Sequence, residues 1–231
     1  MAASLTIRCW WKCRWTARAS NGAGVAPVAK GLRLHRIGLL GGSFNPAHDG
    51  HRHISLEAMR RLGLEEVWWL VSPQNPLKEA AGMASLEARL ASARAAARHP
   101  RIKPMAIESK LGTVYTVDTL AKLQQRHPDK RFIWVMGADN LVQFHRWRSW
   151  RQLATGVPIA VMARPHYIGD ALFAPAMAWL RRFRRRSADA KHWTRWELPA
   201  IVFLNIRLSP QSATAIRRRD PRWAERLMRQ R

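Results

Sequence analysis

The 231-residue sequence predicts an α/β protein in which one parallel sheet is covered by helices on both faces. Two observations lead to this prediction. Short apolar runs alternate along the chain with longer segments in which apolar residues recur at helical spacing. The apolar runs are continuous rather than alternating, as in strands that are buried on both faces. A chain of this length can form a single domain with a sizeable core.

The predicted elements follow one another from Arg36 onward. Residues 37–40 form the first strand, and the next helix is predicted over 51–62, where apolar residues recur every four positions before Gly63. The same reasoning predicts later strands over 67–71, 102–107, 132–136, 158–162 and 201–204, and later helices over 86–98, 117–127 and from 213 to 218. Residues 72–82 are predicted as a proline-containing loop. The Arg- and Trp-rich segment 166–196 is predicted as an excursion from the sheet.

Loops at one edge of the predicted sheet are the expected place for a ligand. In a Rossmann-like, doubly wound sheet, ligands bind beyond the carboxyl ends of the strands. Gly41, Ser72 and Gly137 each come directly after a predicted strand, and Arg164 comes two positions after another. We therefore expect the loops that they begin to share one crevice.

The formal net charge of +25 is the most unusual property of the composition. A polyanionic partner would explain this charge. The basic residues are mostly Arg beside abundant Ala, however, which is typical of codon drift in a GC-rich genome. The Arg-rich run 181–186 is predicted as a solvated surface, and no zinc-finger or RNA-recognition spacing accompanies it. The sequence therefore favours drift over a nucleic-acid partner.

The sequence also bears on membranes and metals. No apolar run reaches the roughly 18 to 20 residues of a membrane span, so we expect a soluble, cytoplasmic protein without a membrane partner. The chain has two Cys, Cys9 and Cys13, and neither has a His at ligand spacing, which argues against a metal site built from side chains. Whether the chain forms a homo-oligomer stays open.

Residues 1–35 differ from the rest of the chain because they contain no Asp or Glu. The segment is basic and contains Ser and Ala, as transit peptides do, but it lacks the continuous apolar core of a secretory signal. Two interpretations stay open: a disordered extension, or translation from an upstream start. In both cases we expect the functional domain to occupy residues 36–231.

The most informative stretch is GGSFNPAHDGH, residues 41–51, between the first strand and the first helix. Gly41 and Gly42 let a ligand approach the backbone closely, and the unpaired amides at a helix start attract phosphate. His48 and His51 place imidazoles at the same point, where they can donate hydrogen bonds to phosphate oxygens as negative charge builds. The stretch therefore predicts a phosphate site.

This pattern, Gly-Gly-Ser-Phe-Asn-Pro-x-His-x-Gly-His, resembles the signature of the HxGH nucleotidylyltransferases, and among them of the bacterial nicotinate-mononucleotide adenylyltransferases. Other segments resemble further motifs of that family in the same order: PQNPLK at 73–78, YTVDTL at 115–120, GADN at 137–140 followed by Trp147, and SATAIR at 212–217. The resemblance covers residues 36–220. The chain departs from the family at Ala213, where a second serine is usual, at Gln211, where the residue is usually apolar, and at Arg148, where an aromatic residue is frequent.

The resemblance implies adenylyl transfer from ATP to nicotinate mononucleotide, which gives deamido-NAD and pyrophosphate in NAD biosynthesis. It implies that His48 and His51 are catalytic, with His51 at the α-phosphate. The residues implied to bind ATP are Gly41, Gly42, Ser43, Phe44, His48, His51, Lys78, Ser212, Thr214 and Arg217. The residues implied to bind the mononucleotide are Asn45, Tyr115, Thr116, Asp139, Trp147 and Arg148. We expect Mg²⁺ to arrive with ATP, held by triphosphate oxygens and water.

Two alternatives stay open. Another adenylyltransferase of the superfamily would act on nicotinamide mononucleotide or phosphopantetheine, although Trp147 and the segment 115–120 favour a pyridine substrate. The alternative from another class is a basic nucleic-acid-binding protein with an inactive nucleotide fold. Steeply salt-dependent DNA binding without pyrophosphate release would favour that alternative.

Overall fold

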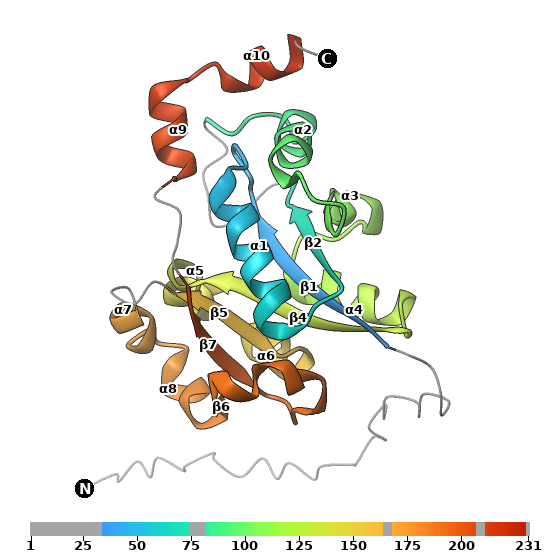
Figure 1. Ribbon diagram of the computed structural model, residues 1–231, viewed down its shortest axis with the longest axis vertical. Helices are drawn as coiled ribbons and strands as arrows, with labels where there is room; N and C mark the ends of the chain where they lie inside the picture. Colours follow the sequence, from blue (N-terminus) through green and yellow to red (C-terminus); the bar gives the residue numbers. More distant parts are fainter. Residues whose placement is uncertain (1–33, 74–81, 164–167, 207–210, 230–231) are drawn as a thin grey trace, which may run out of the picture. The chain divides into compact units, whose positions relative to one another are not determined.

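Seven parallel strands form one sheet in the part of the chain that the computed structural model describes, residues 34–73, 82–163, 168–206 and 211–229 (Figure 1). The strands are β1 (His35–Gly42), β2 (Glu66–Val71), β3 (Ile102–Met105), β4 (Lys130–Gly137), β5 (Ile159–Ala163), β6 (Arg184–Arg185) and β7 (Ile201–Asn205). Their order in the sheet is β3-β2-β1-β4-β5-β7-β6. The strand order reverses between β1 and β4, which is the switch point where doubly wound sheets bind ligands. The predicted fold class is confirmed.

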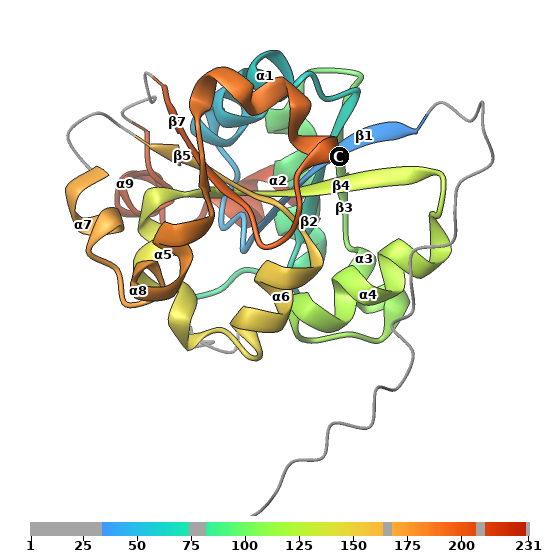
Figure 2. The ribbon, with the colours of Figure 1, turned by 90° about the horizontal axis from the view of Figure 1, so that it is seen from below.

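Helices cover both faces of this sheet, and Figure 2 shows α1 on one side with α4 and α6 on the other. The α-helices are α1 (Asp49–Leu62), α2 (Leu86–Ala97), α3 (Ile107–Leu111), α4 (Thr116–Arg126), α5 (Ala138–Gln143), α6 (Trp150–Gly156), α7 (Ile168–Leu172), α8 (Met177–Leu180), α9 (Ala213–Arg219) and α10 (Trp223–Arg229). The 3₁₀ helices are η1 (Phe144–Arg146), η3 (Arg181–Phe183) and η4 (Ser187–Arg195).

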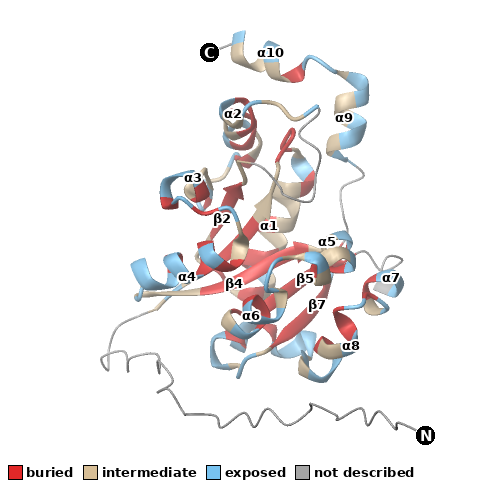
Figure 3. Ribbon diagram, turned by 180° about the vertical axis from the view of Figure 1, so that it is seen from behind, coloured by how far each residue is buried: buried red, intermediate tan, exposed pale blue. Residues whose placement is uncertain are grey.

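Alternate residues of each strand serve two separate cores, one on each face. Ile37 and Leu39 of β1 pack into the core that α3 to α8 cover, whereas Leu40 packs into the core under α1, α2 and η4. Helices pack against both faces of the sheet, so the central strands are buried along most of their length (Figure 3). Burial on both faces is the reason that these strands are continuously apolar in sequence.

The strand predicted over 102–107 is too long, because the chain turns into a helix at its end. The strand stops at Met105, and α3 begins at Ile107. Gly112 ends that helix in the left-handed conformation, with φ of 60°, and its amide donates to carbonyl oxygens of the last turn. The sequence hid this helix because it is only five residues long. Its first turn carries Glu108.

The segment predicted as an excursion from the sheet, 166–196, is partly sheet. Arg184 and Arg185 form β6, which pairs in parallel with Ile201 and Val202 of β7. Two arginines on an edge strand keep their side chains in solvent or half in it, so the pattern has no apolar run to indicate a strand. The helices α5 and α6 also escaped prediction, since each is seven residues or shorter.

Several predictions fall outside the described residues. They include the N-terminal extension up to residue 33, the proline-rich loop over 74–81 with Lys78, and Arg164. The described residues all belong to the compact unit Arg33–Arg231. Within the described part, no helix is both long enough and apolar enough to cross a bilayer.

Candidate active site

A cavity of about 750 Å³ opens beyond the carboxyl ends of β1 and β4, at the switch point of the sheet. Among the residues predicted for the site, those that line it are Gly41, Gly42, Ser43, Phe44, Asn45, His48, His51, Tyr115, Thr116, Asp139, Trp147, Arg148 and Ser212. Thr214 and Arg217 lie outside the lining. The crevice expected at this edge is therefore present, and most of the predicted residues come together in it.

The two histidines cap the first turn of α1, and this fixes how their rings can act. The Gly50 amide donates to His48 Nδ1 over 3.1 Å, and the His48 amide donates to His51 Nδ1 over 3.3 Å. An imidazole nitrogen that accepts a hydrogen bond holds no proton, so the proton of each ring resides on Nε2. Both Nε2 atoms are therefore donors. Helix α1 begins at Asp49, before the predicted start, because His48 supplies the N-cap.

Burial supports the neutral state of His48. It lowers the pKa of His48 below the ordinary histidine value, against the smaller opposing effect of the neighbouring Asp49 carboxylate. A lowered pKa keeps the ring neutral at pH 7, which the cap requires. Gly50 belongs to the same arrangement, since a Cβ there would lie 2.8 Å from the His48 ring. Only glycine leaves room for the imidazole to cover the helix end.

His51 is held in place from behind by a buried aromatic stack. The Phe44 ring lies 4.8 Å from the His51 ring and stacks on Trp69 at 5.1 Å. Trp69 Nε1 donates to Ser55 Oγ over 2.7 Å, and Ser55 Oγ donates to the His51 carbonyl oxygen over 2.9 Å. These contacts leave the His51 ring little freedom. A donor that is fixed in this way can stabilise charge that develops in a transition state without having to reorient.

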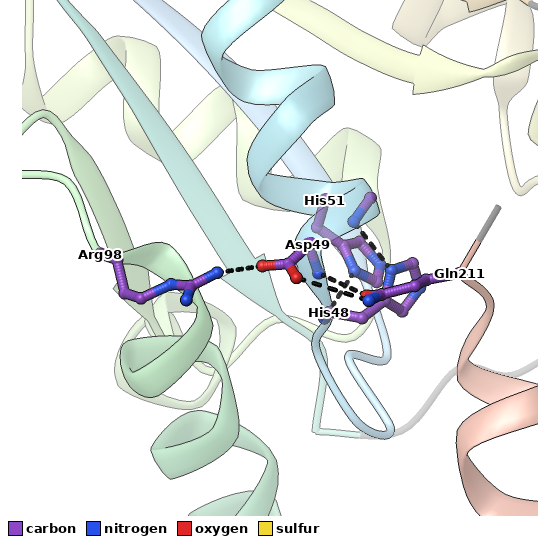
Figure 4. A network of polar contacts seen from close by, with 6 residues as sticks. His48, Asp49, His51, Arg98 and Gln211 are labelled. Atoms are coloured by element: carbon purple, nitrogen blue, oxygen red, sulfur yellow. Dashed lines mark hydrogen bonds and ion pairs between the residues drawn. The ribbon is translucent and has the colours of Figure 1, made fainter. Parts of the chain in front are cut away.

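A second set of contacts joins the helix start to the C-terminal segment (Figure 4). The Asp49 amide donates to Gln211 Oε1 over 3.2 Å, and Gln211 Nε2 donates to Asp49 Oδ2 over 3.4 Å. Arg98, which follows α2, forms an ion pair with the same carboxylate. Gln211, one of the departures from the family pattern, therefore pairs with Asp49, and Arg98 offsets a negative charge that lies at the start of α1.

Arg217 and Asn45 have structural partners in addition to the roles predicted for them. Arg217 Nη1 donates to the Asn45 carbonyl oxygen over 2.6 Å, and Nη2 donates to Thr214 Oγ1 over 3.3 Å. The Asn45 side chain donates to the Gly82 carbonyl oxygen and accepts from the Ala84 amide. These bonds hold α9 and residues 82–84 against the loop 43–48, which joins β1 to α1. Binding of ATP by Thr214 and Arg217, and of the mononucleotide by Asn45, stays a prediction.

Arg89 supports the loop 43–48, and its role was not predicted from the sequence. Its side chain on α2 is only 1% exposed. The guanidinium donates to the carbonyl oxygens of Ala84 and Ser43, each over 2.9 Å, of Ser72 over 2.5 Å and of Pro73 over 2.7 Å. It thus joins the loops that follow β1 and β2. The signal available in the sequence is its place among apolar residues, three positions after Leu86 and four before Ala93.

The other end of the cavity is aromatic. Trp147 lies edge-on to Trp134 at 5.9 Å, and the Arg148 guanidinium lies 4.4 Å from the centre of the Tyr115 ring. Trp134 also explains Gly41, because a Cβ on that glycine would lie 2.6 Å from the indole. The cavity therefore has one end at the start of α1, with two imidazoles, and an aromatic end suited to a flat ring.

Fold and site together define a nucleotide-binding α/β protein. The chain matches a family model described as cytidylyltransferase-like over residues 39–219. It is 58% identical over 191 residues to a probable nicotinate-nucleotide adenylyltransferase of Erythrobacter litoralis, covering 83% of this chain and 87% of that protein. It is 54% identical over 184 residues to a protein of the same description from Parvibaculum lavamentivorans, covering 80% of this chain and 92% of that protein.

A solved structure shares the fold at low identity. Nicotinic acid mononucleotide adenylyltransferase of Plasmodium falciparum, complexed with NaAD, matches with a TM-score of 0.59 and 18% identity, covering 80% of this chain and 83% of that one. The chain belongs to the cytidylyltransferase-like family and, within it, to the nicotinate-nucleotide adenylyltransferases, which makes it a nucleotidyltransferase.

Proposed function

We propose that this chain transfers the adenylyl group of ATP to nicotinate mononucleotide, giving deamido-NAD and pyrophosphate in the cytoplasm. The observation that carries the proposal is the pair of Nε2–H donors that the capped helix start presents to a cavity with an aromatic far end. The two relatives, both described as probable nicotinate-nucleotide adenylyltransferases, support the same substrates.

The reaction requires the protein to position the two substrates and to stabilise the negative charge that develops between them. An oxygen of the mononucleotide 5′-phosphate forms a bond to the α-phosphorus of ATP, while the bond from that phosphorus to the bridging oxygen breaks and pyrophosphate leaves. The attacking phosphate is already ionised at neutral pH, so no general base is required. In this proposal His51 donates to the α-phosphate, where negative charge develops, and His48 donates near the leaving group.

Magnesium fits this site only as a companion of the nucleotide. Among the described residues, no group of three or more His, Cys, Asp and Glu side chains could hold a metal ion. Asp139 lines the cavity and is exposed, so its carboxylate is available to a hydrated cation or to a ribose hydroxyl. Mg²⁺ bound by triphosphate oxygens would neutralise charge on the leaving group.

We expect the enzyme to prefer nicotinate over nicotinamide mononucleotide by at least about tenfold in kcat/KM at about pH 6.5. In this proposal the ring lies against Trp147, with its acid group near the backbone amides of Thr116 and Arg148. A carboxylate accepts both N–H bonds, whereas an amide turns its NH₂ toward one donor and leaves a buried group unpaired, at a cost of about 1 to 3 kcal/mol.

Pyrophosphate release with ATP and each mononucleotide measures this preference. Trp147→Ala serves as the companion variant and should weaken both substrates alike, because stacking does not distinguish acid from amide. Equal rates on the two mononucleotides would show that the pocket does not sense the carboxylate. Release only with phosphopantetheine would point to a different adenylyltransferase.

A further inference from the structure

A buried carboxyl group in the cavity wall has no part in the proposed mechanism. Glu108, in the first turn of α3, is 6% exposed and lines the cavity. Its Oε2 atom has no hydrogen-bond partner among the described residues. Acidic side chains are almost never buried unless they are paired. A buried and incompletely paired carboxyl group in a cavity wall therefore indicates a functional role for Glu108.

The contacts of Glu108 link it to two parts of the cavity wall, the segment after α3 and the end of β2. The Thr113 amide donates to the Glu108 carbonyl oxygen over 3.0 Å, one residue before the lining stretch Val114, Tyr115 and Thr116. Its carboxyl group accepts a hydrogen bond from the Ser72 side chain at the end of β2. The backbone of Ser72 is fixed in turn, since its amide donates to the Gly42 carbonyl oxygen over 3.0 Å.

Most of the charged groups around α3 have partners of their own. They are Glu66 on β2, Asp118, Lys122 and Arg126 on α4, Lys110 on α3 itself, and Arg89, whose guanidinium reaches the Ser72 carbonyl oxygen. Lys122 Nζ donates to the Leu111 carbonyl oxygen, Asp118 lies 3.9 Å from Arg148, and Glu66 accepts from Trp68. Burial raises the pKa of Glu108 to about 7, against the smaller effect of the Ser72 hydrogen bond, which lowers it.

We propose that Glu108 is a specificity-determining residue that senses the charge of the substituent on the pyridine ring. When its side chain is neutral, an anionic substituent can bind, and when its side chain is ionised, it repels an anionic substituent. The inference rests on the proposed function, because it concerns the mononucleotide of that reaction. A carboxylate in a low-dielectric wall acts on a nearby anion even without contact. The amide of nicotinamide mononucleotide carries no charge and escapes this repulsion.

The test is the ratio of kcat/KM for nicotinate mononucleotide to that for nicotinamide mononucleotide, measured from about pH 6 to about pH 8.5. Ionisations of ATP and of the substrate phosphate affect both substrates, so they cancel in the ratio, and the variant Glu108→Gln separates the effect of Glu108 from that of the histidines. The wild-type ratio should fall by about tenfold across this range, with a midpoint near the pKa of Glu108, as expected for one added like charge at an effective dielectric constant of about 20.

Three variants identify the residue responsible. Glu108→Gln keeps the shape without the charge, so its ratio should stay high and constant with pH. Glu87→Gln, an exposed glutamate on α2, is the matched control and should follow the wild type. Ser72→Ala removes the hydrogen bond that favours the ionised form, so the fall should move to higher pH. This last variant tests the proposal even if Glu108→Gln does not fold.

The outcomes separate this inference from the proposed function. A wild-type ratio that is constant with pH overturns the role of Glu108, and so does a Glu108→Gln ratio that falls as the wild type does. An unchanged midpoint in Ser72→Ala also contradicts it. If the wild type forms no dinucleotide from either mononucleotide at any pH, the proposed function fails instead.

Discussion

His51→Ala is expected to lower kcat by about 10²- to 10³-fold while the affinity for ATP changes much less. The reason is that the His51 Nε2–H bond strengthens as negative charge develops at the α-phosphorus, so its loss is felt mainly in the transition state. Initial rates of pyrophosphate release give kcat, and equilibrium titration with ATP gives the ground-state affinity.

The histidine also caps a helix, so a control must separate structure from catalysis. His51→Asn places a side-chain oxygen near the position of Nδ1, which preserves the acceptor for the His48 amide, but it has no donor at the position of Nε2. We expect this variant to unfold at nearly the wild-type temperature and yet to lose nearly as much activity as His51→Ala. A near-normal kcat in either variant would refute the assignment.

Replacing Arg89 by Met is expected to lower the free energy of unfolding by about 3 to 5 kcal/mol. Methionine fills much of the volume but leaves the carbonyl oxygens of Ser43, Ala84, Ser72 and Pro73 without their donor. A loss of this size is a large share of the roughly 5 to 15 kcal/mol that stabilises a typical domain.

Denaturant unfolding measures this loss, and Arg94→Ala provides the matched control. Arg94 is exposed on the same helix, so its removal should change the unfolding free energy by less than about 0.5 kcal/mol. Arg89→Lys should fall between the two, because an ammonium retains the charge but cannot reach carbonyl groups spread over a planar fork. An Arg89→Met protein as stable as the Arg94→Ala control would show that the loops do not depend on this guanidinium.

Prediction from sequence succeeded where a pattern is local. The strands β1, β2, β4, β5 and β7 are continuous apolar runs, and each lies within two residues of its predicted bounds. The stretch 41–51 combines a strand end, a bend and a helix start, so its place at the cavity followed from neighbouring residues alone. Short helices such as α3 have too few residues to establish a period.

Prediction failed where a role depends on distant partners. Arg89 resembles the solvent-exposed arginines of an Ala- and Arg-rich helix, and only the four carbonyl oxygens around it make it structural. Glu108 resembles an ordinary surface glutamate until β2 and the segment after α3 enclose it. The capping role of the histidines needed atomic positions, since spacing cannot tell which nitrogen of a ring accepts.

The contacts between the two ends of the domain have a consequence for the time at which the enzyme first becomes competent. Asp49 and Gln211 are 162 positions apart, and Asn45 and Arg217 are 172 apart. Contacts between residues this far apart form only after both residues have been synthesised, and they slow folding because the loop must close before they are gained. A nascent polypeptide on the ribosome can therefore complete its first strands and helices well before the contacts of Asp49 with Gln211 and of Asn45 with Arg217 exist. Under the proposed function, the site can bind the triphosphate fully only when the stretch that ends in Arg217 has emerged.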